Sequence, residues 1–158
     1  MRRVCVATTL AVALLSAAAS RAGDVALIVN PQNPVADLSF KEVVAIFKAE
    51  QQHWKAGERI YLILLESGGQ ERAVVVKRVY RMSDVELKQF WLAKLFRGEI
   101  PAFPRVVASS AAAKRIVAQA PNALAFIDAT AVDSSVKALR IDGLKAGEPG
   151  YALAETPP

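Results

Sequence analysis

The sequence has 158 residues, of which 53% are hydrophobic and 22% charged, and it carries a formal net charge of +5 and one cysteine. This length fits one domain with one hydrophobic core. Three of the basic residues lie in an N-terminal segment that we expect to be removed, so the rest of the chain is nearly balanced in charge. A balanced chain gives no reason to expect a nucleic acid or an anionic membrane surface as partner.

Residues 1–23 are predicted to be a secretory signal peptide. Two arginines precede an apolar run over residues 4–15, and small residues follow at the positions that signal peptidase reads. The run is too short to span a bilayer, so no membrane insertion is expected after the signal is removed. The mature chain then lacks Cys5, and with it any disulfide, thiolate metal site or thiol nucleophile. The expected location is the bacterial periplasm.

The first part of the mature chain is predicted to form a strand and then a helix. Residues 25–29 are an apolar run, and two prolines in the following loop prevent its continuation. Ser39 and Glu42 have the spacing of a capping box, which predicts a helix from Ser39 to about Lys48. A polar loop with His53 and Trp54 follows.

The stretch from Ile60 to Arg81 organises the chain. Residues 60–65 are a continuous apolar run, which predicts a strand covered on both faces. A turn at residues 66–69 leads into a helix with Val75 and Val79 on its buried side. Unpaired N–H groups at the start of that helix can hold an anion or an oxygen-rich ligand. The alternative is a plain connection between strand and helix.

The second half continues the alternation of helices and strands. A second capping box at Ser83 and Glu86 predicts a helix that carries an apolar stripe including Trp91. The further expected elements are a strand at 105–108, a helix at 111–120 capped by Ser109 or Ser110, and strands at 123–127 and 136–141.

These elements predict an α/β fold, a three-layer sandwich with a mixed, largely parallel sheet flanked by helices. We expect the domain to span residues 24–144. Residues 145–158, which are rich in glycine and proline, are expected to be an extended and loosely held C-terminal tail.

Catalytic chemistry has no positive support in the sequence. His53 is the only histidine, so one chain cannot build a catalytic triad or a multi-histidine metal site. Ser67 lacks the first glycine of a nucleophile elbow. Asp128 and the other aspartates at loop edges show no spacing typical of paired acid–base groups. Trp54 is interpreted as a loop anchor rather than a ligand platform. We therefore predict a protein that is not an enzyme, with no catalytic residue, metal or cofactor.

Three segments together resemble one known family. Residues 38–47, with Trp54 and Gly57 after them, resemble a helix and tryptophan loop of the phosphate ABC-transporter substrate-binding proteins. Residues 121–127 are similar to its final proline-containing strand, and residues 136–143 with 151–153 resemble its closing segment. The resemblance implies a type-II periplasmic-binding fold, of which this chain corresponds mainly to the second of two lobes.

The resemblance also implies where a ligand binds, namely a small oxyanion or another solute at Ser67, Gly68, Gly69 and Gln70. The family places an arginine at the end of the strand and a Ser-Gly-Thr at the start of the helix. Here the strand ends in Leu65 and Glu66, and the triplet corresponds either to residues 67–69 or to residues 70–72. Glu66 repels phosphate, so two functions stay open: a half-site for a solute, or a protein-interaction module that has lost ligand binding. The expected partners are a transporter permease or a second copy of the chain.

Overall fold

The computed structural model describes residues 23–155. The predicted signal peptide therefore lies outside the described residues, except for Gly23. The elements in chain order are β1 (Val25–Val29), β2 (Asp37–Leu38), α1 (Phe40–Phe47), β3 (Tyr61–Leu65), α2 (Gln70–Val75), the π-helix η1 (Val76–Tyr80), α3 (Asp84–Phe96), β4 (Arg105–Val107), α4 (Ser110–Gln119), β5 (Ala123–Asp128), the 3₁₀ helix η2 (Ala129–Ala131), β6 (Lys137–Ala138) and β7 (Arg140–Ile141).

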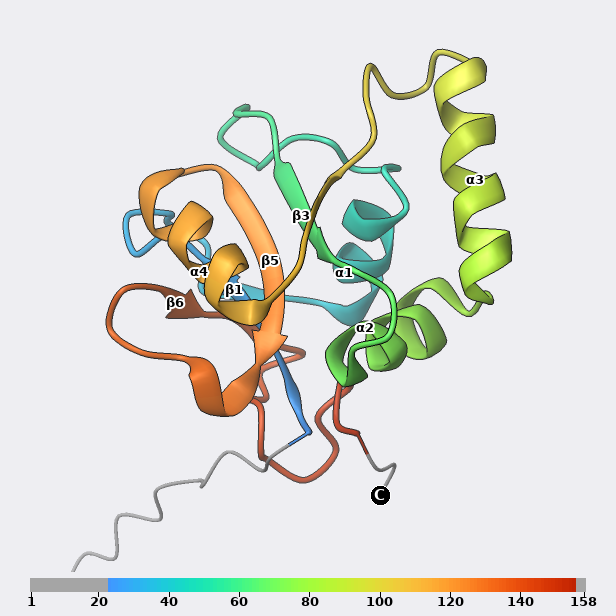
Figure 1. Ribbon diagram of the computed structural model, residues 1–158. Coiled ribbons are helices and arrows are strands. Elements are labelled where there is room, and N and C mark those ends of the chain that lie inside the picture. Colours follow the sequence, from blue (N-terminus) through green and yellow to red (C-terminus); the bar gives the residue numbers. More distant parts are fainter. Residues whose placement is uncertain (1–22, 156–158) are drawn as a thin grey trace, which may run out of the picture.

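The fold is an α/β sandwich around a five-stranded mixed sheet of order β4-β3-β5-β1-β6. Strand β3 runs parallel to both β4 and β5, and β1 is antiparallel to β5 and β6. Figure 1 shows α4 on one face of this sheet, α1 and α2 on the other, and α3 at the outer side of the molecule. The three layers and the mixed sheet confirm the predicted fold class. The parallel half of the sheet, β4-β3-β5, brings three carboxyl ends to one edge.

Both predicted capping boxes are present. The Ser39 hydroxyl accepts from the Glu42 backbone N–H at 3.2 Å, and the Glu42 carboxylate accepts from the Ser39 N–H at 2.9 Å. Ser83 and Glu86 repeat this arrangement at the start of α3. Each box satisfies N–H groups that lack a partner inside the helix, which is why these helices begin where the sequence predicts.

Aromatic side chains fill the core between the sheet and the helices on its α1 face. Phe47 packs against Phe126 of β5 and against Tyr80, with ring centroids 6.1 Å apart in both pairs. Trp91 of α3 contacts Tyr80 in turn and is buried, which confirms its predicted place in the core. These contacts attach α3 to the domain through η1.

Two predicted elements have a different form in the structure. The expected helix after the glycine turn changes from α2 to the π-helix η1, in which the Arg81 N–H donates to the Val76 carbonyl oxygen at 2.8 Å. The expected strand at 136–141 is divided, because the Leu139 N–H still bonds to β1 while the next residue, Arg140, bonds to Ala36. Its two parts, β6 and β7, therefore belong to two different sheets.

The expectation of a loosely held C-terminal tail is wrong for the described residues up to 155. Tyr151 and Leu153 are buried, and the Tyr151 hydroxyl donates to the Val25 carbonyl oxygen at 2.9 Å. The Val25 N–H in turn donates to the Leu153 carbonyl oxygen at 3.1 Å. Burial of one aromatic and one aliphatic side chain holds this segment against β1. The domain boundary that we expect after residue 144 stays a prediction.

Candidate functional site

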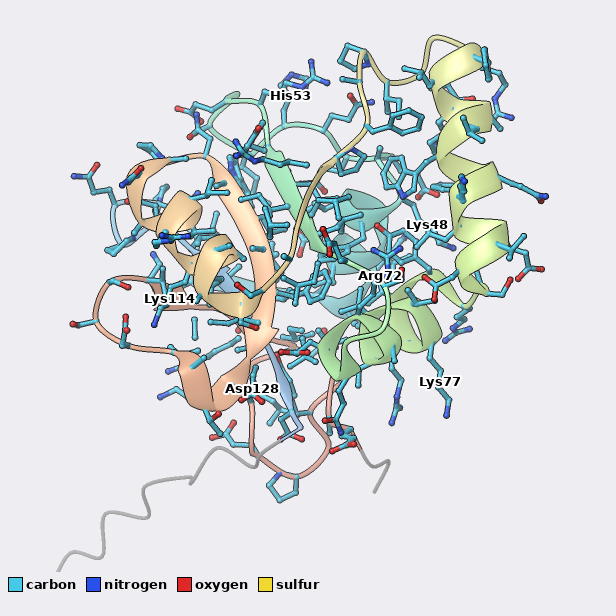
Figure 2. All side chains as sticks on the ribbon, in the orientation of Figure 1. Lys48, His53, Arg72, Lys77, Lys114 and Asp128 are labelled. Atoms are coloured by element: carbon cyan, nitrogen blue, oxygen red, sulfur yellow. The ribbon has the colours of Figure 1, made fainter. Side chains whose placement is uncertain are left out.

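The candidate site lies at the edge where β3, β4 and β5 end. The Glu66 N–H donates to the Val107 carbonyl oxygen at 2.9 Å, which ties the end of β3 to the end of β4. The Asp128 N–H at the end of β5 donates to the Ser110 hydroxyl at 3.4 Å. Figure 2 shows Asp128 at the tip of β5, at the same edge as the start of α2. We call this group of strand ends and helix starts the carboxyl edge.

The four residues predicted to bind a ligand lie together on the carboxyl edge. Ser67, Gly68, Gly69 and Gln70 are all exposed. Gly68 has a φ of +100°, a conformation that glycine adopts without strain. Gly69 occupies the N-cap position of α2 and offers no side chain to accept from the first helical turn. The turn therefore presents backbone N–H groups that have no partner inside the helix.

Arg72 is the basic side chain in the first turn of α2, and it is used structurally. Its Nη1 donates to the Leu65 carbonyl oxygen at 2.7 Å, and its Nε lies 3.1 Å from the Asp84 carboxylate. The side chain is only 15% exposed. Arg72 therefore joins the end of β3 to the start of α3 instead of projecting over the glycine turn (Figure 2). Lys77 points outward from η1 in the same view.

Carboxylates surround the turn. Glu66 is exposed directly before it, and Glu71 accepts from the Ser110 hydroxyl at 3.0 Å. Glu155 of the C-terminal segment accepts from the Gln70 side-chain amide. Its own N–H donates to Asp24 at 3.3 Å. The carboxyl edge thus combines unpaired N–H groups with a rim of negative charge.

Sequence reasoning missed three of these residues as members of the site: Ser110, Asp128 and Glu155. Two of them carry a usable signal. Ser110 and Asp128 each stand where a predicted strand ends, and parallel strands bring such residues to one edge. Glu155 carries none, because the structure alone reveals that the C-terminal segment reaches Gln70.

Trp54 and His53 lie at the opposite edge of the sheet, near the start of β3. The Trp54 indole N–H donates to the Asn122 carbonyl oxygen at 3.3 Å, and the side chain is 5% exposed. This confirms that Trp54 anchors its loop. His53 is exposed, as expected for a surface residue. Between residues 23 and 155 we find no group of three or more His, Cys, Asp and Glu side chains placed to hold a metal ion.

Comparison with known proteins identifies relatives. The search of protein-family models gives no match. The chain is 29% identical over 133 residues to the phosphate-binding protein PstS of Bacillus subtilis (strain 168), a match that covers 84% of this chain and 40% of that protein. Its fold matches a protein of Clostridium perfringens, described as a phosphate ABC-transporter substrate-binding protein with bound phosphate, at a TM-score of 0.63 and 25% identity. The chain is a relative of the phosphate ABC-transporter substrate-binding proteins.

This relationship extends over most of the chain and less than half of each relative. The Clostridium perfringens match covers 78% of this chain and 46% of that one. An ABC-type phosphate transport receptor from Vibrio cholerae has the same fold, with a TM-score of 0.62, 24% identity and coverage of 78% and 48%. The chain spans less than half the length of these substrate-binding proteins. In the part of the chain that the structure describes, no helix has both the length and the hydropathy to cross a membrane.

Proposed function

We propose that the chain is an exported, non-enzymatic, solute-binding-like protein with an oxyanion half-site at Ser67, Gly68, Gly69 and Gln70. The uncapped turn at the carboxyl edge supports this function most directly. It lies at the edge where open α/β sheets bind ligands, and it opens a helix whose N-terminal end carries partial positive charge. A relative with the same fold holds phosphate.

The chemistry of the half-site comes from the backbone. The first N–H groups of α2 lack intrahelical partners, and Gly69 leaves them uncapped. Gly68 and Gly69 carry no side chains, so an oxyanion reaches the backbone without a steric barrier. The Ser67 hydroxyl adds one further donor. Such a set of neutral donors recognises the oxygens of phosphate or sulfate and takes part in no covalent chemistry.

The rim weakens anion binding. Glu66 and Glu71 flank the turn, and Arg72 is held by Leu65 and Asp84 and does not offset their charge. Tight small-ligand sites also bury most of the ligand, whereas this turn is exposed. We therefore propose weak anion binding by the isolated chain. Strong binding requires a second surface, contributed by another copy of the chain or by a transporter permease.

The acidic rim favours one alternative, a protein-interaction module in which the carboxyl edge docks a partner and binds no solute. Glu66, Glu71 and Asp128 present negative charge beside exposed backbone donors. Such a surface selects a partner with basic side chains by charge complementarity. Light scattering and chemical cross-linking distinguish self-association from a monomer, and cross-links at Glu66 place the interface at this edge.

Calorimetric titration of the mature protein, starting at Asp24, with phosphate and sulfate tests the half-site. A saturable heat for either oxyanion, absent with chloride at the same ionic strength, supports solute binding. No heat and no thermal shift at millimolar oxyanion contradicts binding by the isolated chain, and leaves the protein-interaction function as the better account.

A further inference from the structure

A second hollow lies at the opposite edge of the sheet from the half-site. Its volume is about 510 Å³, and its lining includes Asn33, Pro34, Val35, Asp37, Trp54 and Glu58. We call it the Trp54 pocket. The Tyr61 N–H and the Trp54 indole both donate to the Asn122 carbonyl oxygen, which places the pocket beside the amino ends of β3 and β5. A volume of this size is typical of small-molecule sites.

The walls of the Trp54 pocket are fixed by hydrogen bonds between distant segments. The buried Asn33 amide donates to the Pro121 carbonyl oxygen at 3.2 Å, and its Oδ1 accepts from the Val35 N–H at 3.0 Å. The Trp54 N–H donates to the Glu58 carbonyl oxygen at 2.8 Å, which closes the turn between them. Because these walls are already ordered, a ligand loses little free energy in ordering them.

The side chains of the lining combine an apolar floor with an excess of negative charge. Pro34, Val35 and Trp54 supply apolar surface. Lys55, the one basic side chain of the lining, pairs with Glu42 at 3.2 Å, so these two charges offset each other. Asp37 and Glu58 remain, and neither belongs to an ion pair among the residues that the structure describes. The Asp37 carboxylate accepts one hydrogen bond, from the Gly143 N–H at 3.3 Å.

We propose that the Trp54 pocket binds a small organic cation with an apolar body. The apolar body contacts Pro34, Val35 and the small exposed part of Trp54, and the cationic group lies near the carboxylates of Asp37 and Glu58. A cation gains from both carboxylates, whereas an anion of the same shape is repelled. The site is separate from the half-site, so the two proposals succeed or fail independently.

Three probes of one shape and different charge test this proposal: phenethylamine, phenethyl alcohol and phenylacetate. Each is titrated into the full mature protein, labelled with ¹⁵N, and the side-chain signals of Trp54 and Asn33 are followed by NMR. Phenethylamine is expected to shift both signals and to bind about tenfold more tightly than phenylacetate. Equal binding of all three probes, or no shift of either signal at about 10 mM phenethylamine, overturns the proposal.

A pair of matched double variants checks the source of the preference. Asp37→Asn with Glu58→Gln removes two exposed carboxylates of the pocket and is expected to abolish the preference for the amine. Glu50→Gln with Glu148→Gln changes the net charge equally at residues outside the lining, and is expected to preserve it. An equal loss in both double variants assigns the preference to overall charge and contradicts a specific cation site.

Discussion

The Arg72 guanidinium donates to the Leu65 carbonyl oxygen at 2.7 Å, across the turn that connects β3 to α2. This contact, together with the ion pair to Asp84, fixes the strand end, the helix start and the beginning of α3 relative to one another. It also holds the Arg72 charge at Leu65 and Asp84, away from any oxyanion bound at the glycine turn. Arg72 therefore shapes the half-site without adding charge to it.

Replacing Arg72 is expected to reduce stability more than it reduces anion binding. Arg72→Ala removes a hydrogen bond from a charged donor and should lower the free energy of unfolding by about 1.5–3 kcal/mol. Chemical denaturation measures this change, and Lys77→Ala, at an exposed position, is the control. A free energy of unfolding equal to that of the control variant contradicts the structural role of Arg72.

Removing the charge of Glu66 is expected to strengthen phosphate binding. At about 4 Å in water two unit charges interact by about 1 kcal/mol, so Glu66→Gln should raise the affinity about fivefold. Calorimetry measures the change, and Glu58→Gln, in the Trp54 pocket at the opposite edge of the sheet, should leave the affinity unaltered. Unchanged or weaker phosphate binding in Glu66→Gln places the anion elsewhere.

The two glycines of the turn are expected to respond differently to alanine. Gly68 has a φ of +100° and open space around it, so the cost of Gly68→Ala comes from the backbone alone, about 1–2 kcal/mol. Gly69 has a φ of −86°, which alanine adopts readily, and an added Cβ meets only the Glu71 side chain at 3.3 Å. Thermal or chemical denaturation of both variants checks this, and equal losses contradict the assigned turn geometry.

Local signals predicted the elements that carry the half-site. One sequence suffices to locate the capping boxes at Ser39 and Ser83 and the glycine turn, because each of these features depends on residues within a few positions of one another. The burial of Val75, Val79 and Trp91 also follows from helical periodicity alone.

Contacts between distant segments could not be predicted in this way. The hydroxyl of Ser110 joins Glu71 to the end of β5, and Arg72 finds its partner in Asp84. Both depend on how strands and helices meet in space. The burial of Tyr151 was missed for the same reason, because glycine and proline around it indicate a loop and say nothing of the cavity that the ring fills.

Replacing two buried tyrosines by phenylalanine is expected to change stability differently at neutral pH. The Tyr80 hydroxyl is buried without a hydrogen-bond partner among residues 23–155, so Tyr80→Phe should leave stability unchanged or raise it. The Tyr151 hydroxyl donates to Val25, so Tyr151→Phe should cost about 1 kcal/mol. Chemical denaturation at neutral pH compares the two, and a larger loss in Tyr80→Phe contradicts the assignment of partners.

The protein is expected to lose stability in alkali because of the same two tyrosines. Burial raises the pKa of Tyr80 and, together with the charge of Asp24, the pKa of Tyr151 well above their usual range. The unfolded chain then releases these protons first, at a pH of about 10. Their contribution to stability is full below that pH and is lost as the pH rises toward the folded pKa. Denaturation between neutral pH and a pH of about 11 measures this loss of stability. The loss should be smaller in Tyr80→Phe than in the native protein. An identical pH dependence of stability in the two proteins contradicts the role of Tyr80.

Phosphate titration of the native protein and of Gly69→Asp, followed through the backbone amide signals of residues 67–72, tests the half-site most directly. An aspartate at this N-cap accepts from the same N–H groups that an oxyanion needs, and it stabilises the helix by a few tenths of a kcal/mol. We predict saturable shifts of these amides in the native protein, no shifts in Gly69→Asp, and equal or higher thermal stability of the variant. Equal phosphate binding by both proteins, or shifts confined to another region of the native protein, would contradict a half-site at Ser67, Gly68, Gly69 and Gln70.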